Sequence, residues 1–426
     1  MEINVKLSTI VKPAETTPGQ AIWLSCLDLA NKHVYGTSVC FYRHNGASNF
    51  FDTELLKEAL SKVLVPFYPF AGRFNHNNDG RLEINCNEEG ALFVEAETTS
   101  NMDDLGDFAP SPELKKLVPT VDTSGGICTI PILIVQLTRF KCGGVSLGFG
   151  MDHQVVDGSS ALHFVASFSE VARGLDLSIP PFLDRSLLAP RNPPQIMFNH
   201  TEFKNFVPNM KESSQINIVK LKMTKEQGSI LKAKAKGGSN TNYTTFEILS
   251  AHIWKCVCKA RAQPHDEESA LYFPVNGRFN RLQPPLPPGF FGSVNFGATA
   301  VSLVGDILSN PVWYAANLIH QTLLRMNNDY LRSAIDYLES QPNIMTIKRG
   351  SNICVCPNLS VTSWVNLPTH EADFGWGRPI YMGPTKITFE GKSYILPSAT
   401  DDGSLSVAIA LHTEHVKEFN KLFYEF

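Results

Sequence analysis

A glycine-rich segment holds the residues best suited to acid–base chemistry. Residues 143–158 have the sequence GGVSLGFGMDHQVVDG, in which apolar residues alternate with small ones up to Asp152. This alternation predicts a β-strand with one small face, which leaves room for close approach of a ligand. His153 then lies where the strand ends, four residues before Asp157. An imidazole can remove a proton from a hydroxyl or amine near neutral pH, and the carboxylate can fix its tautomer or the loop.

Two interpretations of His153 remain open on the residues alone. One is a general base, and the other is a histidine satisfied by local hydrogen bonds. The same segment also matches G-x-S-x-G at residues 144–148, which is typical of the hydrolase nucleophile elbow. That elbow needs a sharp turn at Ser146, but the alternation continues to Met151 and predicts a strand there. We therefore do not expect a serine hydrolase.

Other catalytic and cofactor motifs are missing from the sequence. It contains no H-E-x-x-H, no phosphate-binding G-x-x-x-x-G-K-[ST] and no strand-linked G-x-G-x-x-G. The nine cysteines include C-x-C pairs but no C-x-x-C set. We expect no metal site, no nucleotide cofactor, and reduced thiols that are mostly in the core.

A second distinctive segment is DFGWG at residues 373–377. Two glycines around a bulky aromatic residue fix backbone shape more readily than they supply chemistry. We interpret Asp373, Gly375, Trp376 and Gly377 as a structural turn with a buried tryptophan.

The elements that must position these residues divide between two mixed α/β halves. A proline-rich stretch is neither a central strand nor a helix, so we predict domains at 1–177 and 215–426 joined by a crossover linker at 178–214. Ser159 or Ser160 is expected to cap the helix that follows Gly158. Periodicity and capping signals predict further helices at 53–64, 225–236, 245–262 and 413–426, and strands at 81–85, 128–137, 219–223 and 404–411.

Composition limits the class of protein. The 426 residues are 43% hydrophobic, and 37 basic against 41 acidic residues give a formal net charge of −4. This mild acidity argues against bulk nucleic-acid binding. No apolar run reaches the roughly 20 residues of a spanning helix, and the N-terminus shows no signal-peptide pattern. We expect a cytoplasmic protein.

Together the two motifs identify the chain as similar to the plant BAHD acyl-CoA-dependent acyltransferases. His153-x-x-x-Asp157-Gly158 and the DFGWG segment resemble that family's signature pair. Several further segments resemble its hydroxycinnamoyl-CoA shikimate/quinate hydroxycinnamoyltransferase branch. They are residues 8–14, 65–73, 284–292, 362–365 and 403–411.

The resemblance implies a fold and a mechanism. The fold is two chloramphenicol-acetyltransferase-like α/β domains with mixed sheets and an active-site channel at their interface. Acyl-CoA is a co-substrate, and no other cofactor is needed. His153 removes the proton of the acceptor hydroxyl, and no covalent enzyme intermediate forms. Asp157 has a structural role and pairs with an arginine, which is Arg278 or Arg281 in this sequence.

The resemblance also implies substrate-binding residues. Arg349 stands thirteen residues before Thr362, at the distance of the arginine that binds the acceptor carboxylate in this branch. Thr362 and Trp364 lie near the reacting centre, and Thr362 hydrogen-bonds the acceptor or the oxyanion. Ser38 and Cys40 occupy the positions of the aromatic acyl pocket, where the branch commonly has Ser and Tyr. Other departures from the branch are Gln154, Ser293 and Asn366.

We therefore expect transfer of a p-coumaroyl or caffeoyl group from CoA to a hydroxyl of a carboxylic-acid acceptor such as shikimate or quinate. Alternatives are hydroxyphenyllactate, as in rosmarinic acid synthase, tartrate or malate, or an amine. A non-catalytic paralogue that only binds acyl-CoA is a further alternative. The expected partners are small molecules, without nucleic acid or membrane, and the expected state is a monomer.

Overall fold

The computed structural model describes residues 1–203, 215–236, 241–279, 281–344, 347, 351–398 and 402–426. The chain forms two compact units. Unit 1 comprises Met1–Ala189, Leu286–Val294 and Leu367–Lys386, and unit 2 comprises Pro190–Pro285, Asn295–Asn366 and Ile387–Phe426. Both units are mixed α/β, as expected. The predicted domains are continuous in the sequence, with boundaries at 177 and 214. In the structure, two later segments, Leu286–Val294 and Leu367–Lys386, also belong to unit 1, and the second contains DFGWG.

Unit 1 is built on a six-stranded mixed sheet. Only the β6–β7 pair is parallel, and the other neighbours are antiparallel. The strand order is β1(Asn4–Val11), β6(Ala91–Glu97), β7(Leu133–Arg139), β8(Val145–Asp152), β3(Tyr35–Tyr42) and β13(Tyr381–Pro384). A smaller sheet contains β2(Ile22–Trp23), β5(Leu82–Asn85) and β4(Arg73–His76). The edge strand β13 comes from the segment that follows DFGWG, which explains why Leu367–Lys386 belongs to this unit.

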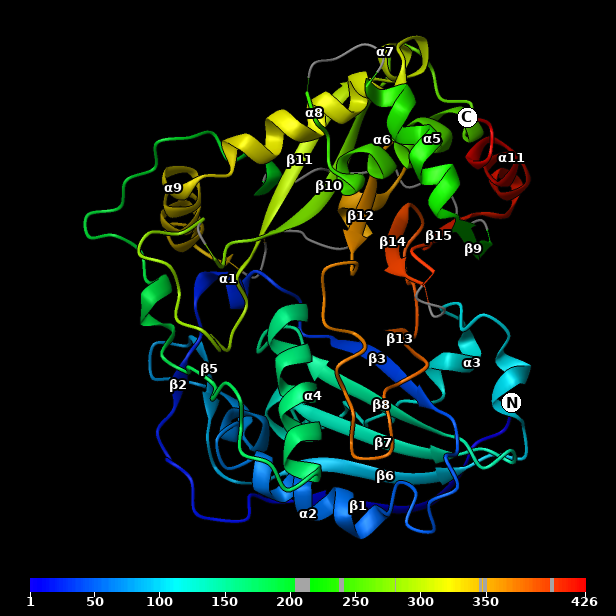
Figure 1. The fold of residues 1–426 in the computed structure, drawn as a ribbon. Coiled ribbons are helices and arrows are strands. Elements are labelled where there is room, and N and C mark those ends of the chain that lie inside the picture. Colours follow the sequence, from blue (N-terminus) through cyan, green and yellow to red (C-terminus); the bar gives the residue numbers. More distant parts are fainter. Residues whose placement is uncertain (204–214, 237–240, 280, 345–346, 348–350, 399–401) are drawn as a thin grey trace. The chain divides into compact units, whose positions relative to one another are not determined.

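The helices of unit 1 include two long ones that pack against each other, α2(Thr53–Val63) and α4(Gly158–Ala172) (Figure 1). Short helical turns make up the rest. They are α1(Cys26–Leu29), α3(Pro112–Lys115), η1(Tyr68–Ala71), η2(Met102–Leu105), η3(Ile127–Thr129) and η4(Arg185–Leu188).

The glycines of β8 serve packing inside unit 1. Every residue of β8 is buried. A Cβ on Gly148 would lie 1.8 Å from the carbonyl oxygen of Leu117, and one on Gly150 would lie 2.6 Å from Ile134. The expectation that the small face admits a ligand is therefore wrong for these two glycines. Protein atoms fill the space that their missing side chains leave.

Unit 2 contains a second six-stranded mixed sheet. Its β10–β12 and β12–β14 pairs are parallel and the others antiparallel. The order is β11(Asn295–Leu303), β10(Glu268–Asn276), β12(Leu359–Ser363), β14(Lys392–Pro397), β15(Leu405–His412) and β9(Ile216–Met223). The buried helix α6(Thr245–Ala260) begins with a capping box between Thr244 and Glu247, and it packs against α8 and α11. The other helices are α5(Lys225–Lys236), α7(Val304–Ser309), α8(Val312–Arg325), α9(Asn328–Glu339), α10(Ser351–Cys354), α11(Thr413–Phe423) and η5(Thr201–Phe203).

Most elements predicted from periodicity are confirmed. Helices α2, α5, α6 and α11 and strands β5, β9 and β15 agree with the expected ranges to within a few residues. Two expectations need correction. The strand predicted from Cys128 begins at Leu133, because η3 and the N–H-lacking Pro131 precede it. The N-cap of α4 is Asp157 and not Ser159 or Ser160.

Residues 191–202 of the proline-rich stretch are held by polar contacts with α9. Asp336 accepts hydrogen bonds from the backbone N–H groups of Arg191 and Gln195, both at 2.8 Å. Ser333 Oγ, fully buried, accepts from the backbone N–H of Met197 at 2.9 Å. These contacts give this part of the predicted linker a defined path along α9. Residues 204–214 of the predicted linker lie outside the described residues.

All nine cysteines are free, and six of them are buried, which confirms the expectation of mostly core thiols. Among the described residues, no helix combines the length and apolar character needed to cross a bilayer.

Candidate active site

His153 lies in the turn after β8 with one ring nitrogen fixed and its side chain exposed. Its Nδ1 lies 3.2 Å from the carbonyl oxygen of Val156. A carbonyl oxygen can only accept, so the neutral ring carries its hydrogen on Nδ1 and leaves a lone pair on Nε2. The exposed imidazole thus presents a proton acceptor from a defined tautomer.

The turn that carries His153 is held at several points. The backbone N–H of His153 donates to Val34 at 3.1 Å, and those of Val155 and Val156 donate to the carbonyl of Asp152. The buried carboxylate of Asp152 accepts from the N–H of Gln154 at 2.8 Å and pairs with His33 at 2.5 Å. These contacts fix the backbone from which the imidazole projects.

The imidazole also lies against the neighbouring strand β3 at Gly36. A Cβ at Gly36 would come within 2.7 Å of His153 Nε2 and 3.0 Å of Cε1. Only a residue without a side chain therefore leaves the ring in this position. Sequence analysis missed Gly36, which lies far from His153 in the chain and carries no recognisable motif.

Asp157 acts on the backbone and not on the imidazole in the described contacts. Its Oδ1 accepts from the N–H of Ser160 at 3.0 Å, which caps α4. Its Oδ2 accepts from the N–H of Val294 at 2.9 Å. The buried carboxylate thereby joins the start of α4 to the Leu286–Val294 segment. The choice between Arg278 and Arg281 as its ionic partner stays a prediction.

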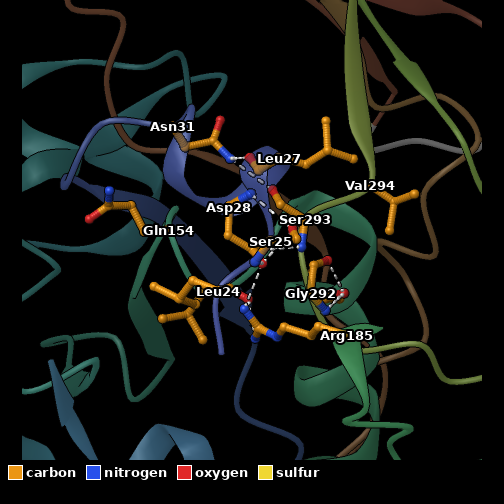
Figure 2. Close-up of polar contacts among 12 residues, drawn as sticks. Leu24, Ser25, Leu27, Asp28, Asn31, Gln154, Arg185, Gly292, Ser293 and Val294 are labelled. Carbon is orange, nitrogen blue, oxygen red and sulfur yellow. Dashed lines mark hydrogen bonds and ion pairs between the residues drawn. The ribbon is translucent and has the colours of Figure 1, made fainter. Parts of the chain in front are cut away.

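A second buried carboxylate holds the same segment, and sequence analysis missed it (Figure 2). Asp28 Oδ1 accepts from the N–H of Ser293 at 2.8 Å, and Oδ2 lies 3.0 Å from Nη1 of Arg185. Both side chains are almost completely buried. Arg185 also donates to the carbonyl of Val155, two residues after His153, at 3.0 Å. This ion pair therefore connects α1, the turn after His153 and the Leu286–Val294 segment.

Ser38 and Cys40 lie on β3, on the same face as Gly36, because alternate residues of a strand share a face. Ser38 is half-buried, whereas Cys40 is fully buried. Burial raises the pKa of the Cys40 thiol to about 12, against a small opposing effect of Tyr42. Cys40 is therefore a neutral thiol and not a nucleophile at neutral pH. Their part in an acyl pocket stays a prediction.

The DFGWG segment forms a compact turn in unit 1. Asp373 Oδ1 accepts from the N–H groups of Gly375 at 2.8 Å and Gly377 at 3.0 Å. Both glycines have positive φ angles, 101° and 107°, which residues with side chains rarely adopt. The Trp376 ring is buried against Phe51, with the ring centres 4.8 Å apart. Two further hydrogen bonds tie the segment to the chain before α2: Asn45 donates to the Trp376 carbonyl at 3.1 Å, and Trp376 Nε1 donates to Asn49 Oδ1 at 3.3 Å.

Unit 2 carries the other candidate residues on β12 and just beyond its end. Thr362 and Trp364 are half-buried, and the Trp364 ring meets that of Tyr394 edge to face at 6.3 Å. A lysine that sequence analysis missed, Lys392, donates to Thr362 Oγ1 at 2.5 Å. Arg349 lies outside the described residues. The alternating pattern of residues 392–396 could have suggested that Lys392 shares a face with Tyr394, but not that it reaches Thr362.

The described parts of both units contain no group of three histidine, cysteine or acidic side chains placed to hold a metal ion. The chemistry available from the residues above is proton transfer by His153 and hydrogen-bond donation by Thr362.

Comparison with known proteins places the chain in one transferase family. The model of a transferase family matches residues 1–426. The chain is 52% identical to shikimate O-hydroxycinnamoyltransferase of Nicotiana tabacum, with 100% of both chains covered. It is 49% identical, also over 100% of both, to rosmarinate synthase of Plectranthus scutellarioides. It is 45% identical to a hydroxycinnamoyl-CoA:5-hydroxyanthranilate N-hydroxycinnamoyltransferase of Avena sativa, with 99% of each covered.

Solved structures show the same fold. Vinorine synthase superposes with a TM-score of 0.78 at 21% identity, with 100% of both chains covered. TRI101 of F. graminearum, in complex with coenzyme A and T-2 mycotoxin, superposes with a TM-score of 0.75 at 15% identity, covering 94% of this chain and 97% of its own. The expected two-domain α/β fold is thereby confirmed.

Proposed function

The chain belongs to the BAHD transferase family, and from this premise we propose that it moves a hydroxycinnamoyl group from CoA to a hydroxyl of a carboxylic acid such as shikimate or quinate. It is an acyl-CoA-dependent acyltransferase. The observation that carries the proposal is the exposed imidazole of His153, whose Nδ1 is fixed on the Val156 carbonyl and whose Nε2 is left as the base.

The proposed reaction needs one base and no covalent enzyme intermediate. Nε2 of His153 takes the proton of the acceptor hydroxyl as its oxygen bonds to the thioester carbonyl carbon. The carbonyl electron pair moves to oxygen and forms a tetrahedral oxyanion. When the carbonyl re-forms, the C–S bond breaks and the imidazolium returns its proton to the CoA thiolate. The products are an ester and free CoA.

The acceptor is proposed from two kinds of support. The relative with 52% identity is named for shikimate. By resemblance, Arg349 stands at the position of the carboxylate-binding arginine of this branch, and a guanidinium offers parallel donors to the two carboxylate oxygens. Hydroxyphenyllactate, tartrate and malate share this carboxylate and remain alternatives, and rosmarinate synthase is among the relatives. An amine acceptor is the other alternative, because a 5-hydroxyanthranilate N-transferase is also a relative.

The test is an acceptor panel with p-coumaroyl-CoA as donor and release of free thiol as readout. The panel contains shikimate, quinate, hydroxyphenyllactate, tartrate, malate and 5-hydroxyanthranilate, and methyl shikimate tests the carboxylate. We expect the highest kcat/KM with shikimate or quinate. A higher value with the amine would overturn the proposed acceptor, and no thiol release with any acceptor would favour a non-catalytic acyl-CoA-binding protein. We further propose a cytoplasmic monomer.

A further inference from the structure

Lys392 holds two hydroxyl groups on the neighbouring strand of unit 2. It is the first residue of β14, which runs parallel to β12 with Lys392 opposite Ser360. Its Nζ donates to Thr362 Oγ1 at 2.5 Å and to Ser360 Oγ at 3.3 Å. The ammonium also lies 5.1 Å from the centre of the Tyr394 ring. Two hydroxyls and an aromatic face therefore surround this cation.

Among the described residues, no carboxylate pairs with the positive charge of Lys392. Within the described ranges, no carboxylate lies within ion-pair distance of its Nζ. The side chain is half-buried, and desolvation lowers the pKa of Lys392. An incompletely solvated cation without a counter-ion costs free energy. A functional role beside Thr362 would account for this costly placement of the Lys392 cation.

The direction of the hydrogen bond determines what Thr362 can do. An ammonium only donates, so Thr362 Oγ1 must accept from Lys392. The hydroxyl hydrogen of Thr362 then points elsewhere, and no described residue accepts it. A hydroxyl that accepts a charge-assisted hydrogen bond becomes a stronger donor, because the two bonds polarise each other. Thr362 is thus a fixed and strengthened donor with a free hydrogen.

We propose that Lys392 is a positioning residue for acyl transfer, which orients and polarises Thr362 so that its hydroxyl donates to the oxyanion of the tetrahedral intermediate. The inference rests on the proposed function. A donor reinforced by a positive charge stabilises most where negative charge develops, so it acts on the transition state more than on substrate binding. Loss of Lys392 should lower kcat and leave the KM values for both substrates nearly unchanged.

A double-mutant cycle tests this inference. Removing the charge with Lys392→Met and the hydroxyl with Thr362→Val should each lower kcat by roughly 100-fold, the lower end of the range for lost oxyanion donors. Because Lys392 acts through Thr362, the double variant should be no slower than Thr362→Val alone. Lys392→Arg, which keeps the charge, should recover part of the loss.

Lys255→Met is the matched control. Lys255 is another half-buried lysine of unit 2 with a pKa lowered by burial, but its Nζ donates to the carbonyls of Leu308 and Asn310. Its variant should lose stability without losing kcat. If Lys392→Met does not fold, Lys392→Gln completes the cycle, because it keeps an N–H donor without the charge.

The possible outcomes separate this inference from the proposed function. The inference would be overturned if folded Lys392→Met kept kcat within about twofold of wild type. It would also be overturned if the fold-losses in kcat of the two single variants multiplied in the double variant. In either case, turnover by the wild type would still support the proposed function. A wild-type protein that releases no thiol with any acceptor would overturn both.

Discussion

The imidazole of His153 lies against the Cα of Gly36, so that a methyl group at Gly36 would come within 2.7 Å of Nε2. The two residues come from the end of β8 and the start of β3, which pair antiparallel. The position of the proposed base therefore depends on the absence of a side chain on a neighbouring strand.

Gly36→Ala should displace the imidazole and lower kcat by roughly 100-fold, as expected for a misplacement of about 1 Å. The exposed ring can move away, so the melting temperature should change little. Initial rates of thiol release and thermal unfolding measure the two effects. Gly19→Ala is the control, because no atom lies within 4 Å of the added methyl. Wild-type kcat in Gly36→Ala would show that the ring position seen here is not required.

His153→Ala should lower kcat by roughly 10²- to 10⁴-fold, the range for removal of a general base. Folding should be little changed, because the side chain is exposed and its one described side-chain hydrogen bond is to the Val156 carbonyl. Circular dichroism and thiol release with p-coumaroyl-CoA check both parts. His44→Ala, at another exposed histidine of unit 1, should keep wild-type rates. Near-wild-type turnover of His153→Ala would reject the base assignment.

Asp157→Asn should destabilise the protein as well as lower its activity. An amide can still accept from Ser160, but its NH₂ group would face the N–H of Val294, donor against donor. Leaving the N–H of Val294 without an acceptor should lower the free energy of unfolding by about 1–3 kcal/mol. Chemical denaturation measures it. Asp52→Asn is the matched control, because Asp52 caps α2 from an exposed position, where Asn caps as well as Asp. A stable Asp157→Asn that lost only its proton-transfer rate would make Asp157 a catalytic orienter instead.

Most helices and strands could be predicted from the sequence, because caps and apolar periodicity act between residues that are close in the chain. The capping box of Thr244 and Glu247 and the apolar residues after it define α6 within a few residues. The predicted N-cap of α4 is wrong, because serine and aspartate are comparable caps and Asp157, Ser159 and Ser160 all stand within four residues. Only the structure shows that the Asp157 carboxylate accepts from Ser160.

Long-range contacts could not be predicted from the order of residues. The segments Leu286–Val294 and Leu367–Lys386 join unit 1 through hydrogen bonds to Asp28 and Asp157 and through the pairing of β13 with β3. Unit 1 therefore consists of three separate segments of the chain, which a single boundary in the sequence cannot describe. His153 was found because its motif is contiguous, whereas Gly36 and Lys392 depend on which strands become neighbours.

Arg349→Ala should weaken the use of acid acceptors. A bidentate contact to a carboxylate contributes about 1.5–3 kcal/mol, so kcat/KM for shikimate should fall roughly 10- to 150-fold. The KM for p-coumaroyl-CoA should stay nearly fixed, and the gap between shikimate and its methyl ester should narrow. Arg349→Lys should recover only part of the loss, because an ammonium lacks the planar fork.

Lys348→Ala is the control for Arg349, because it removes the adjacent charge in the sequence. It should leave acceptor kinetics unchanged. If wild type uses the ester as well as the acid, or if Arg349→Ala behaves like Lys348→Ala, the carboxylate contact is not used here. An uncharged acceptor would then become the better proposal.

Asp336 should make the stability of unit 2 depend on acid pH. Burial alone would raise the pKa of this carboxyl, but hydrogen bonds from the backbone of Arg191 and Gln195 and the Arg191 guanidinium, whose Nε lies 2.7 Å away, hold the pKa below its usual range. A carboxyl with a lowered pKa in the folded state stabilises that state above its unfolded pKa, about 4, and the stabilisation is lost as pH falls further.

Asp336→Asn should therefore lower the unfolding free energy by about 1.5–3 kcal/mol at pH 7, where the carboxylate accepts its charge-assisted bonds. The difference between wild type and variant should shrink progressively below about pH 4, because the wild-type carboxyl is then protonated while the amide does not titrate. Unfolding measured at pH 7, 5, 4 and 3 gives this difference directly. Asp329→Asn, at an exposed aspartate in the first turn of the same helix, should change stability by less than about 1 kcal/mol. A pH-independent difference for Asp336→Asn would show that the loss comes from packing and not from the charge.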